Sequence, residues 1–212
     1  MTRLLTFLFF LPFLALTQET SEKTVQLSEV VEKTVLVPHE EVTRSVNSSE
    51  TKVKWIGSAL SKKHWGHIPV KSASVVEKAN RLVRASFVLD MTSLDVGDIP
   101  ADKGGKDLEK HLKNDDFFST KLYPEAKLVV KDAVLMENGM FLANGDLTIK
   151  GITKPIKFNA KRDSDNLYSG SLVFNRADYG IKYKSKSFFS LKKLGDKVIY
   201  DNVEVAFSVA LN

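Results

Sequence analysis

The C-terminus reads Val203-Glu-Val-Ala-Phe-Ser-Val-Ala-Leu211, in which large apolar residues alternate with polar or small ones. Side chains of a β-strand point alternately to its two faces, so this period of two puts all five large residues on one face. The other face carries only Glu, Ser and Ala. The segment is therefore predicted to be a strand with one side buried and the other in water.

The same alternation recurs along the chain from about residue 42. It is clear at residues 83–91 and 141–149, shorter at 156–160 and 168–174, and weaker at 42–46, 52–59, 66–76 and 126–136. Turn-forming stretches separate several of these segments, at Glu137-Asn-Gly139, Thr153-Lys-Pro155 and Asp163-Ser-Asp-Asn166. About eight or nine strands joined by short turns must be antiparallel. The pattern alone leaves a sandwich and a closed barrel both open.

One helix is expected in this β-rich chain, at residues 107–113, where Leu108, His111 and Leu112 share a side. It would cover a sheet edge or close one end of a barrel. The chain has no cysteine, which excludes disulfides, thiolate metal sites and thiol catalysis. Its 212 residues suffice for one domain whose core needs no cross-links.

The N-terminus has the pattern of a secretory signal peptide. Arg3 precedes an almost unbroken apolar run from Leu4 to Leu16, which is shorter than the roughly 17–25 residues of a membrane-spanning helix. Residues 1–17 are predicted to be the signal, cleaved before Gln18, with an uncleaved anchor as the alternative. Residues 18–41 are predicted to be an N-terminal extension or linker, and residues 42–212 the folded domain.

The formal net charge is +5 at neutral pH. Residues 18–50 are net negative, with seven Glu against three basic residues, so the positive excess falls in residues 51–212. Such a basic surface suits nucleic acid, anionic lipid or simple solubility. Export argues against nucleic acid, which is therefore not expected as a partner.

Five motifs follow one another along the folded domain. They are Ser86-Phe-Val-Leu-Asp-Met-Thr-Ser-Leu94, His111-Leu-Lys-Asn-Asp-Asp-Phe-Phe118 with Tyr123-Pro124, Gly145-Asp-Leu-Thr-Ile-Lys-Gly-Ile-Thr-Lys-Pro155, Asp178-Tyr-Gly-Ile-Lys-Tyr183 and Lys186-Ser-Phe-Phe189. In these motifs and their order the chain resembles the YceI-like family of exported bacterial proteins. It departs from the family at Ser119, where Asp is usual, at Lys127-Leu128 and at His64-Trp-Gly-His67.

The resemblance implies an all-β fold, an eight-stranded antiparallel lipocalin-like barrel with one short helix and a covering loop. It also implies a periplasmic carrier or store that binds a polyisoprenoid, an isoprenoid quinone or a comparable amphiphilic lipid inside the barrel, without a cofactor. An eight-stranded barrel is just wide enough to hold one slim ligand. The oligomeric state is left open, a homodimer included.

The inward-facing apolar side chains are the predicted lining of the ligand site. The loop pairs Phe117-Phe118 and Phe188-Phe189 are added, because exposed loops rarely carry paired Phe unless they line a mouth or cavity. The full predicted lining is Trp55, Phe87, Leu89, Phe117, Phe118, Phe141, Leu147, Ile149, Phe158, Phe174, Phe188, Phe189 and Phe207. For each strand residue in this set, ordinary core packing is an equal alternative.

Polar residues near the loop pairs are candidates for the head-group end of the site. His111, Lys184 and Lys186 are assigned to this mouth, where lysines could neutralise a diphosphate or allow transient contact with an anionic membrane. An alternative makes His111, with Asp115 and Asp116, the acid–base group of a hydrolase or isomerase acting on an amphiphile. A third reading is a filled structural barrel that binds a protein partner.

No metal site is expected in the chain. His64 and His67 are three residues apart, so on a strand they point to opposite faces and cannot share an ion. Glycine-rich phosphate loops, G-x-S-x-G elbows and zinc-protease motifs are all missing from the sequence. The sequence therefore predicts a binding protein and not an enzyme.

Overall fold

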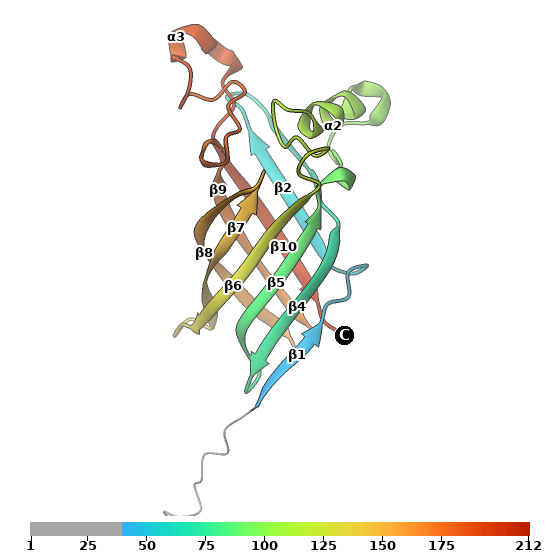
Figure 1. The fold of residues 1–212 in the computed structure, drawn as a ribbon, viewed down its shortest axis with the longest axis vertical. Coiled ribbons are helices and arrows are strands. Elements are labelled where there is room, and N and C mark those ends of the chain that lie inside the picture. The colour runs from blue at the N-terminus through green and yellow to red at the C-terminus, as the bar shows by residue number, and fades with distance from the viewer. Residues whose placement is uncertain (1–39) are drawn as a thin grey trace, which may run out of the picture. The chain divides into compact units, whose positions relative to one another are not determined.

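The computed structural model describes residues 40–212 and forms one antiparallel sheet of ten strands (Figure 1). The strand order is β1-β4-β5-β6-β7-β8-β9-β10-β2-β3. The predicted signal peptide, and the predicted extension up to residue 39, lie outside the described residues. The strands are β1 (Glu41–Ser45), β2 (Lys52–Ser58), β3 (Lys63–His67), β4 (Val70–Lys78), β5 (Arg81–Asp90), β6 (Glu125–Leu135), β7 (Met140–Ile149), β8 (Ile152–Ser164), β9 (Leu167–Asn175) and β10 (Asn202–Ala210).

The strand count differs from the expected eight because the first hairpin is interrupted on both sides. β1 pairs with β4, and β2 pairs with β3 in almost the same register, so residues 41–58 and 63–78 form one long broken hairpin. Counted this way, two broken strands and six continuous ones make up the ten segments. The predicted all-β, antiparallel, lipocalin-like class is confirmed.

The sheet curls until its late and early strands meet. β10 pairs with β2 over residues 204–208, and a further bridge joins Val46, just after β1, to Leu211, just after β10. Two backbone bonds flank that bridge: Asn47 donates to the Ala210 carbonyl at 2.8 Å and Asn212 donates to the Ser45 carbonyl at 3.1 Å. The curled sheet therefore encloses one interior face, as an eight-stranded barrel does.

Two-residue turns set the register of two hairpins. Ala79 and Asn80, between β4 and β5, both have positive φ, as do Lys150 and Gly151 between β7 and β8. Positive φ at both central positions is typical of the type I′ turn, whose twist matches that of the flanking strands. The turn predicted at Thr153-Lys-Pro155 is wrong, because these residues lie inside β8. Pro155 is tolerated there because β9 pairs with β8 only from Asn159 onward.

Helical segments gather at one end of the curled sheet (Figure 1). Between β5 and β6 the chain forms η1 (Met91–Ser93), η2 (Ala101–Lys103) and α2 (Gly105–Lys113), which matches the helix expected at 107–113. Between β9 and β10 it forms η3 (Arg176–Tyr179), α3 (Leu191–Leu194) and η4 (Gly195–Lys197). No helix within residues 40–212 is both long and apolar enough to cross a membrane.

Candidate functional site

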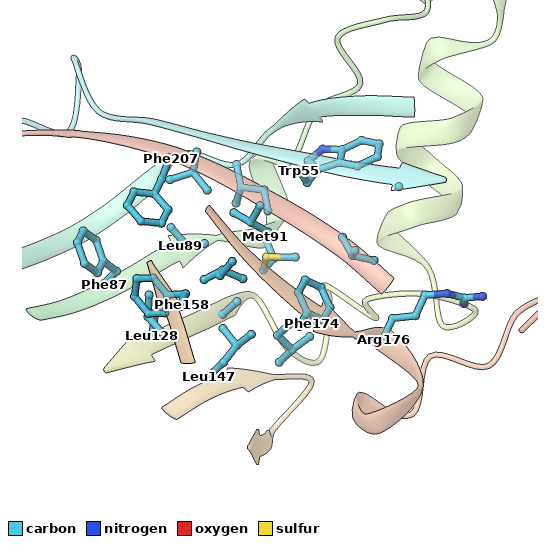
Figure 2. A pocket seen from close by; sticks show the side chains of 18 of the residues that line it. Trp55, Phe87, Leu89, Met91, Leu128, Leu147, Phe158, Phe174, Arg176 and Phe207 are labelled. Carbon is cyan, nitrogen blue, oxygen red and sulfur yellow. The ribbon is translucent and has the colours of Figure 1, made fainter. Parts of the chain in front are cut away.

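The interior of the curled sheet holds an apolar cavity of about 210 Å³. Every strand except β1 contributes to its lining, and Leu108 and Leu112 of α2 reach it from the helical end. Figure 2 shows side chains from different strands converging on this space, with Arg176 at one end of it. The cavity is therefore a property of the whole sheet and not of one loop.

The lining of the cavity extends along most of β5. Along β5 its lining starts at Leu82 and continues through Leu89 to Met91, which is about 30 Å of extended chain at roughly 3.3 Å per residue. A slim, extended apolar ligand suits this shape better than a compact one.

Ten of the thirteen predicted lining residues border the cavity. They are Trp55, Phe87, Leu89, Phe117, Phe118, Leu147, Ile149, Phe158, Phe174 and Phe207. Phe141 is buried, at 3% exposure, but lies outside the lining and packs against Tyr168, with ring centres 6.2 Å apart. Phe188 and Phe189 also lie outside it, on the surface, because their loop turns away from the interior.

Several lining residues were not predicted from the sequence, and Leu82 shows why. The alternation of apolar and polar residues along 83–91 predicted that the Val83 side chain points inward, whereas in the structure Leu82 lines the cavity. A register shift in the β4–β5 pairing, between Val76 and Glu77, moves the inward face by one residue there. Such a β-bulge leaves no mark in the local pattern. Small inward residues, among them Ala85, Ala126 and Ala160, help to keep the interior open.

A buried polar cluster closes the cavity at the end far from α2. The Tyr168 hydroxyl, which lines the cavity, donates a hydrogen bond to the carboxylate of Glu77, and Glu77 is only 4% exposed. Arg44 and Arg162 lie 3.4 and 3.5 Å from the same carboxylate. Burial, and then the bond to Glu77, raise the pKa of Tyr168, so this hydroxyl keeps its proton at neutral pH.

Arg176 organises the opposite end and was not singled out in the sequence. Its side chain borders the cavity, and its guanidinium donates to the carbonyl groups of Ile181, Tyr183, Ile199 and Tyr200 at 2.9–3.2 Å. Asp201 lies 3.4 Å away, and burial lowers the pKa of Arg176. One buried cation thus fixes both ends of the loop that follows β9.

The covering segment that follows β5 is docked along β3. His64, which borders the cavity, is 2.8 Å from Asp98 through Nδ1, and the backbone amides of Trp65 and His67 donate to the carboxylates of Asp98 and Asp95. His64 and His67 therefore pair with different carboxylates. Within residues 40–212, no group of three or more potential metal ligands comes together.

The residues assigned to the head group lie at the helical end but outside the lining. His111 is 3.0 Å from Asp116 through Nε2, and its ring packs edge-on against Phe117 and Tyr183. Lys184 is half-buried with its ammonium 5.0 Å from the Tyr183 ring, and Lys186 is exposed. His111 thus contacts two aromatic rings and one carboxylate and does not border the cavity.

Comparison with protein families gives a match over almost all of the described residues. The family model of the YceI-like domain matches residues 41–211. A UPF0312 protein of Shewanella denitrificans is 32% identical over 90 residues, which cover 38% of this chain and 47% of that protein. A UPF0312 protein of Photorhabdus laumondii is 43% identical over 53 residues, covering 25% of this chain and 27% of that one. The matched part is thus about half of these relatives or less.

Two solved structures share the fold at low sequence identity. BcnA of Burkholderia cenocepacia has a TM-score of 0.62 and 19% identity, over 77% of this chain and 98% of BcnA. A polyisoprenoid binding domain from Saccharophagus degradans, implicated in plant cell wall breakdown, has a TM-score of 0.55 and 15% identity. That likeness covers 82% of this chain and 99% of that domain. At this identity the likeness establishes the fold alone.

Proposed function

The chain belongs to the YceI-like domain family, and we propose that it binds one long-chain amphiphilic lipid, a polyisoprenoid or an isoprenoid quinone, inside its barrel. The observation that carries the proposal is the long cavity, lined almost wholly by apolar side chains from nine strands. A fold neighbour described as a polyisoprenoid binding domain supports this class of ligand.

Burial of an apolar chain supplies enough free energy for tight binding. Each CH₂ group moved from water into an apolar interior contributes about 0.8 kcal/mol. Drug-sized and larger ligands retain about 0.3 kcal/mol per heavy atom after the costs of binding, so a lipid that buries about 40 heavy atoms would reach nanomolar affinity. Such binding requires no catalytic group and no cofactor.

The polar end of the ligand would lie at the helical end of the barrel. The opposite end is closed by the Tyr168–Glu77 cluster, where both partners are already satisfied. The helical end holds Arg176, His64 and the exposed lysines of the loop after β9. We therefore place the head group there and propose that the protein serves as a carrier or store in the periplasm.

Mass spectrometry of gently purified protein tests the proposal directly. The full chain, expressed with its N-terminal stretch in a bacterial host, is measured under native and then denaturing conditions. We expect an added mass under native conditions that extracts as a prenyl lipid or quinone. A lipid-free protein that also fails to take up added isoprenoid quinone would overturn the proposal.

A matched pair of variants links the bound mass to the cavity. Ala85 lies on the cavity wall, so Ala85→Phe puts a ring into the space that the ligand would occupy. Ala206 lies between two lining residues of β10 and is itself outside the lining, so Ala206→Phe makes the same change on the other face of the sheet. Ala85→Phe is expected to remove most of the added mass, and Ala206→Phe to leave it unchanged.

A further inference from the structure

Positive charge is concentrated in the loop between β9 and β10. Residues 182–200 hold six lysines against a single aspartate, a net charge of +5, which equals the formal charge of the whole chain. The rest of the chain is therefore neutral by the same count. Figure 1 shows this loop, with α3, projecting beyond the end of the sheet.

The same loop exposes large aromatic side chains. Phe188 is 43% exposed and Phe189 is 37% exposed. Lysine ammonium groups lie over their rings: Lys182 is 5.0 Å from the centre of Phe188 and Lys193 is 5.4 Å from that of Phe189. Exposed aromatic rings beside lysines are typical of surfaces that enter the head-group region of a bilayer.

Hydrogen bonds tie the loop to the turn between β2 and β3. Tyr200 donates its amide to the Ser58 carbonyl at 2.8 Å, and Leu60 donates to the Val198 carbonyl at 3.3 Å. Within the loop, the Ser187 hydroxyl donates to Asp201 at 2.6 Å. Leu60 is 59% exposed and Tyr200 39% exposed. We call these four apolar or aromatic residues and the nearby lysines the docking lip. It consists of Leu60, Phe188, Phe189 and Tyr200 with Lys62, Lys182, Lys184, Lys186, Lys192, Lys193 and Lys197.

The docking lip adjoins the cavity. A shallow surface depression, lined by residues 58–63 and Tyr200, shares Ser58, Ala59 and Tyr200 with the lining of the cavity. The cavity therefore adjoins the surface between the β2–β3 turn and Tyr200. A ligand leaving there would pass beside the ring of Tyr200, which belongs to the same docking lip as Phe188 and Phe189.

We propose that the docking lip binds the surface of an anionic bilayer and holds the cavity against it. The lysines would lie among anionic head groups, while Leu60, Phe188, Phe189 and Tyr200 enter the interface. A lipid could then move between bilayer and barrel without crossing water. This transfer rests on the proposed lipid-binding function, whereas the docking itself can be tested without any ligand.

Vesicle co-sedimentation measures the docking. The full chain is mixed with vesicles of phosphatidylcholine and phosphatidylglycerol, and separately with vesicles of pure phosphatidylcholine. We expect binding to the anionic vesicles that weakens as salt is raised, because the Debye length falls from about 10 Å at 0.1 M to about 3 Å at 1 M. Equal binding to both vesicle types, or none to either, would overturn the proposal.

Three double variants locate the contact. Lys192→Gln/Lys193→Gln is expected to weaken binding to anionic vesicles about 10- to 30-fold, at roughly fivefold per lysine near the surface. Phe188→Ala/Phe189→Ala is expected to weaken it on the order of tenfold, since exposed rings that enter the interface are lost. Lys52→Gln/Lys157→Gln, which removes the same charge from exposed positions on β2 and β8 that form no ion pair, is expected to bind like the wild type. Equal losses in all three would contradict a localised lip.

The two proposals fail in different ways. A protein that carries lipid by native mass spectrometry, yet ignores anionic vesicles, would overturn the docking lip alone. A protein that binds anionic vesicles through the docking lip, yet never carries or accepts isoprenoid lipid, would support the docking lip and overturn the proposal that the cavity binds an isoprenoid lipid. Circular dichroism of each variant confirms that the β-sheet is retained.

Discussion

Arg176 is the side chain on which the helical end of the barrel depends most. It is 2% exposed, bonds to four backbone carbonyl groups and lies 3.4 Å from Asp201, which is itself 6% exposed. A buried charge of this kind is tolerated only when its partners satisfy it. Its removal would leave Asp201 without its cationic partner and the four carbonyl groups without their donor.

We expect Arg176→Met to lower the free energy of unfolding by about 3–5 kcal/mol, the usual cost of removing one partner of a buried ion pair. Methionine keeps much of the apolar stem, so the loss reflects the guanidinium. Urea denaturation measures the change. Arg81→Met, at the exposed first residue of β5, is the control and should stay within about 0.5 kcal/mol of the wild type.

A second variant keeps this prediction testable if Arg176→Met alone is too unstable to purify. Asp201→Asn in the same chain removes the orphaned charge, and the double variant should be more stable than Arg176→Met. An Arg176→Met protein as stable as Arg81→Met would show that the carbonyl groups find water instead, and the predicted role would be wrong.

At the scale of elements, β3 matters because the covering segment lies directly on it. A Cβ atom on Gly66 would stand 2.0 Å from the Asp95 carbonyl oxygen and 2.7 Å from the Trp55 indole nitrogen. Only glycine lets the two backbones approach so closely. The Trp55 indole in turn donates to the same carbonyl at 2.9 Å, so strand, covering segment and cavity wall are held as one unit.

Asp98 gives this docking a pH dependence. Burial alone would raise the pKa of Asp98, but hydrogen bonds from His64 and the Trp65 amide outweigh it and lower the pKa below its ordinary value of 3.8. Because the pKa is lower in the folded state, the stabilisation is fully present above about pH 4 and is lost as the pH falls through the folded-state pKa.

We expect Asp98→Asn to destabilise the protein by about 1 kcal/mol at neutral pH, a value reduced by the partial exposure of both side chains. The difference from the wild type should shrink as the pH falls below about 4. Urea midpoints across this range measure it, and hydrogen exchange at Trp65 and His67 reports the local effect. Asp102→Asn, at an exposed position in η2, is the control. A difference that stays constant with pH would contradict the assignment.

For the whole molecule, a ligand held by the folded barrel should stabilise it. A ligand that binds only the native state adds about 2.7 kcal/mol to stability at a hundred times its dissociation constant. For a domain of this size, each kcal/mol changes the melting temperature by roughly 2–4 °C. Extraction of the lipid is therefore expected to lower the melting temperature by about 5–10 °C.

Scanning calorimetry before and after organic extraction checks this expectation. Native mass spectrometry must confirm that the bound mass has gone, and added isoprenoid quinone should restore the original temperature. Ala85→Phe should show little change on extraction, since its ring already occupies part of the cavity. An unchanged melting temperature in a fully extracted wild type would favour the filled-barrel reading instead.

The alternation of apolar and polar residues in the sequence determined the class of fold and most of the residues that face the interior. In β7, buried residues alternate with half-buried ones along the whole strand, as the pattern over residues 141–149 predicted. The family motifs then selected a barrel over a sandwich, a choice that the alternation itself left open. Ten predicted lining residues border the cavity because inward and outward faces follow from local geometry.

Only the tertiary structure decided what depends on partners distant in sequence. The bulge at Val83 beside Leu82, the break in the first hairpin and the packing of Phe141 against Tyr168 outside the cavity lining all depend on residues of other strands. Arg176 was missed because its carbonyl partners carry no sequence signature. Phe188 and Phe189 were predicted to line the barrel mouth or cavity because paired Phe is rare in exposed loops, whereas the structure places them on the surface, outside the cavity lining. The alternation of apolar and polar residues along a strand determines which face of the strand a side chain occupies. The neighbouring strands and the paths of the loops determine which residues that face contacts.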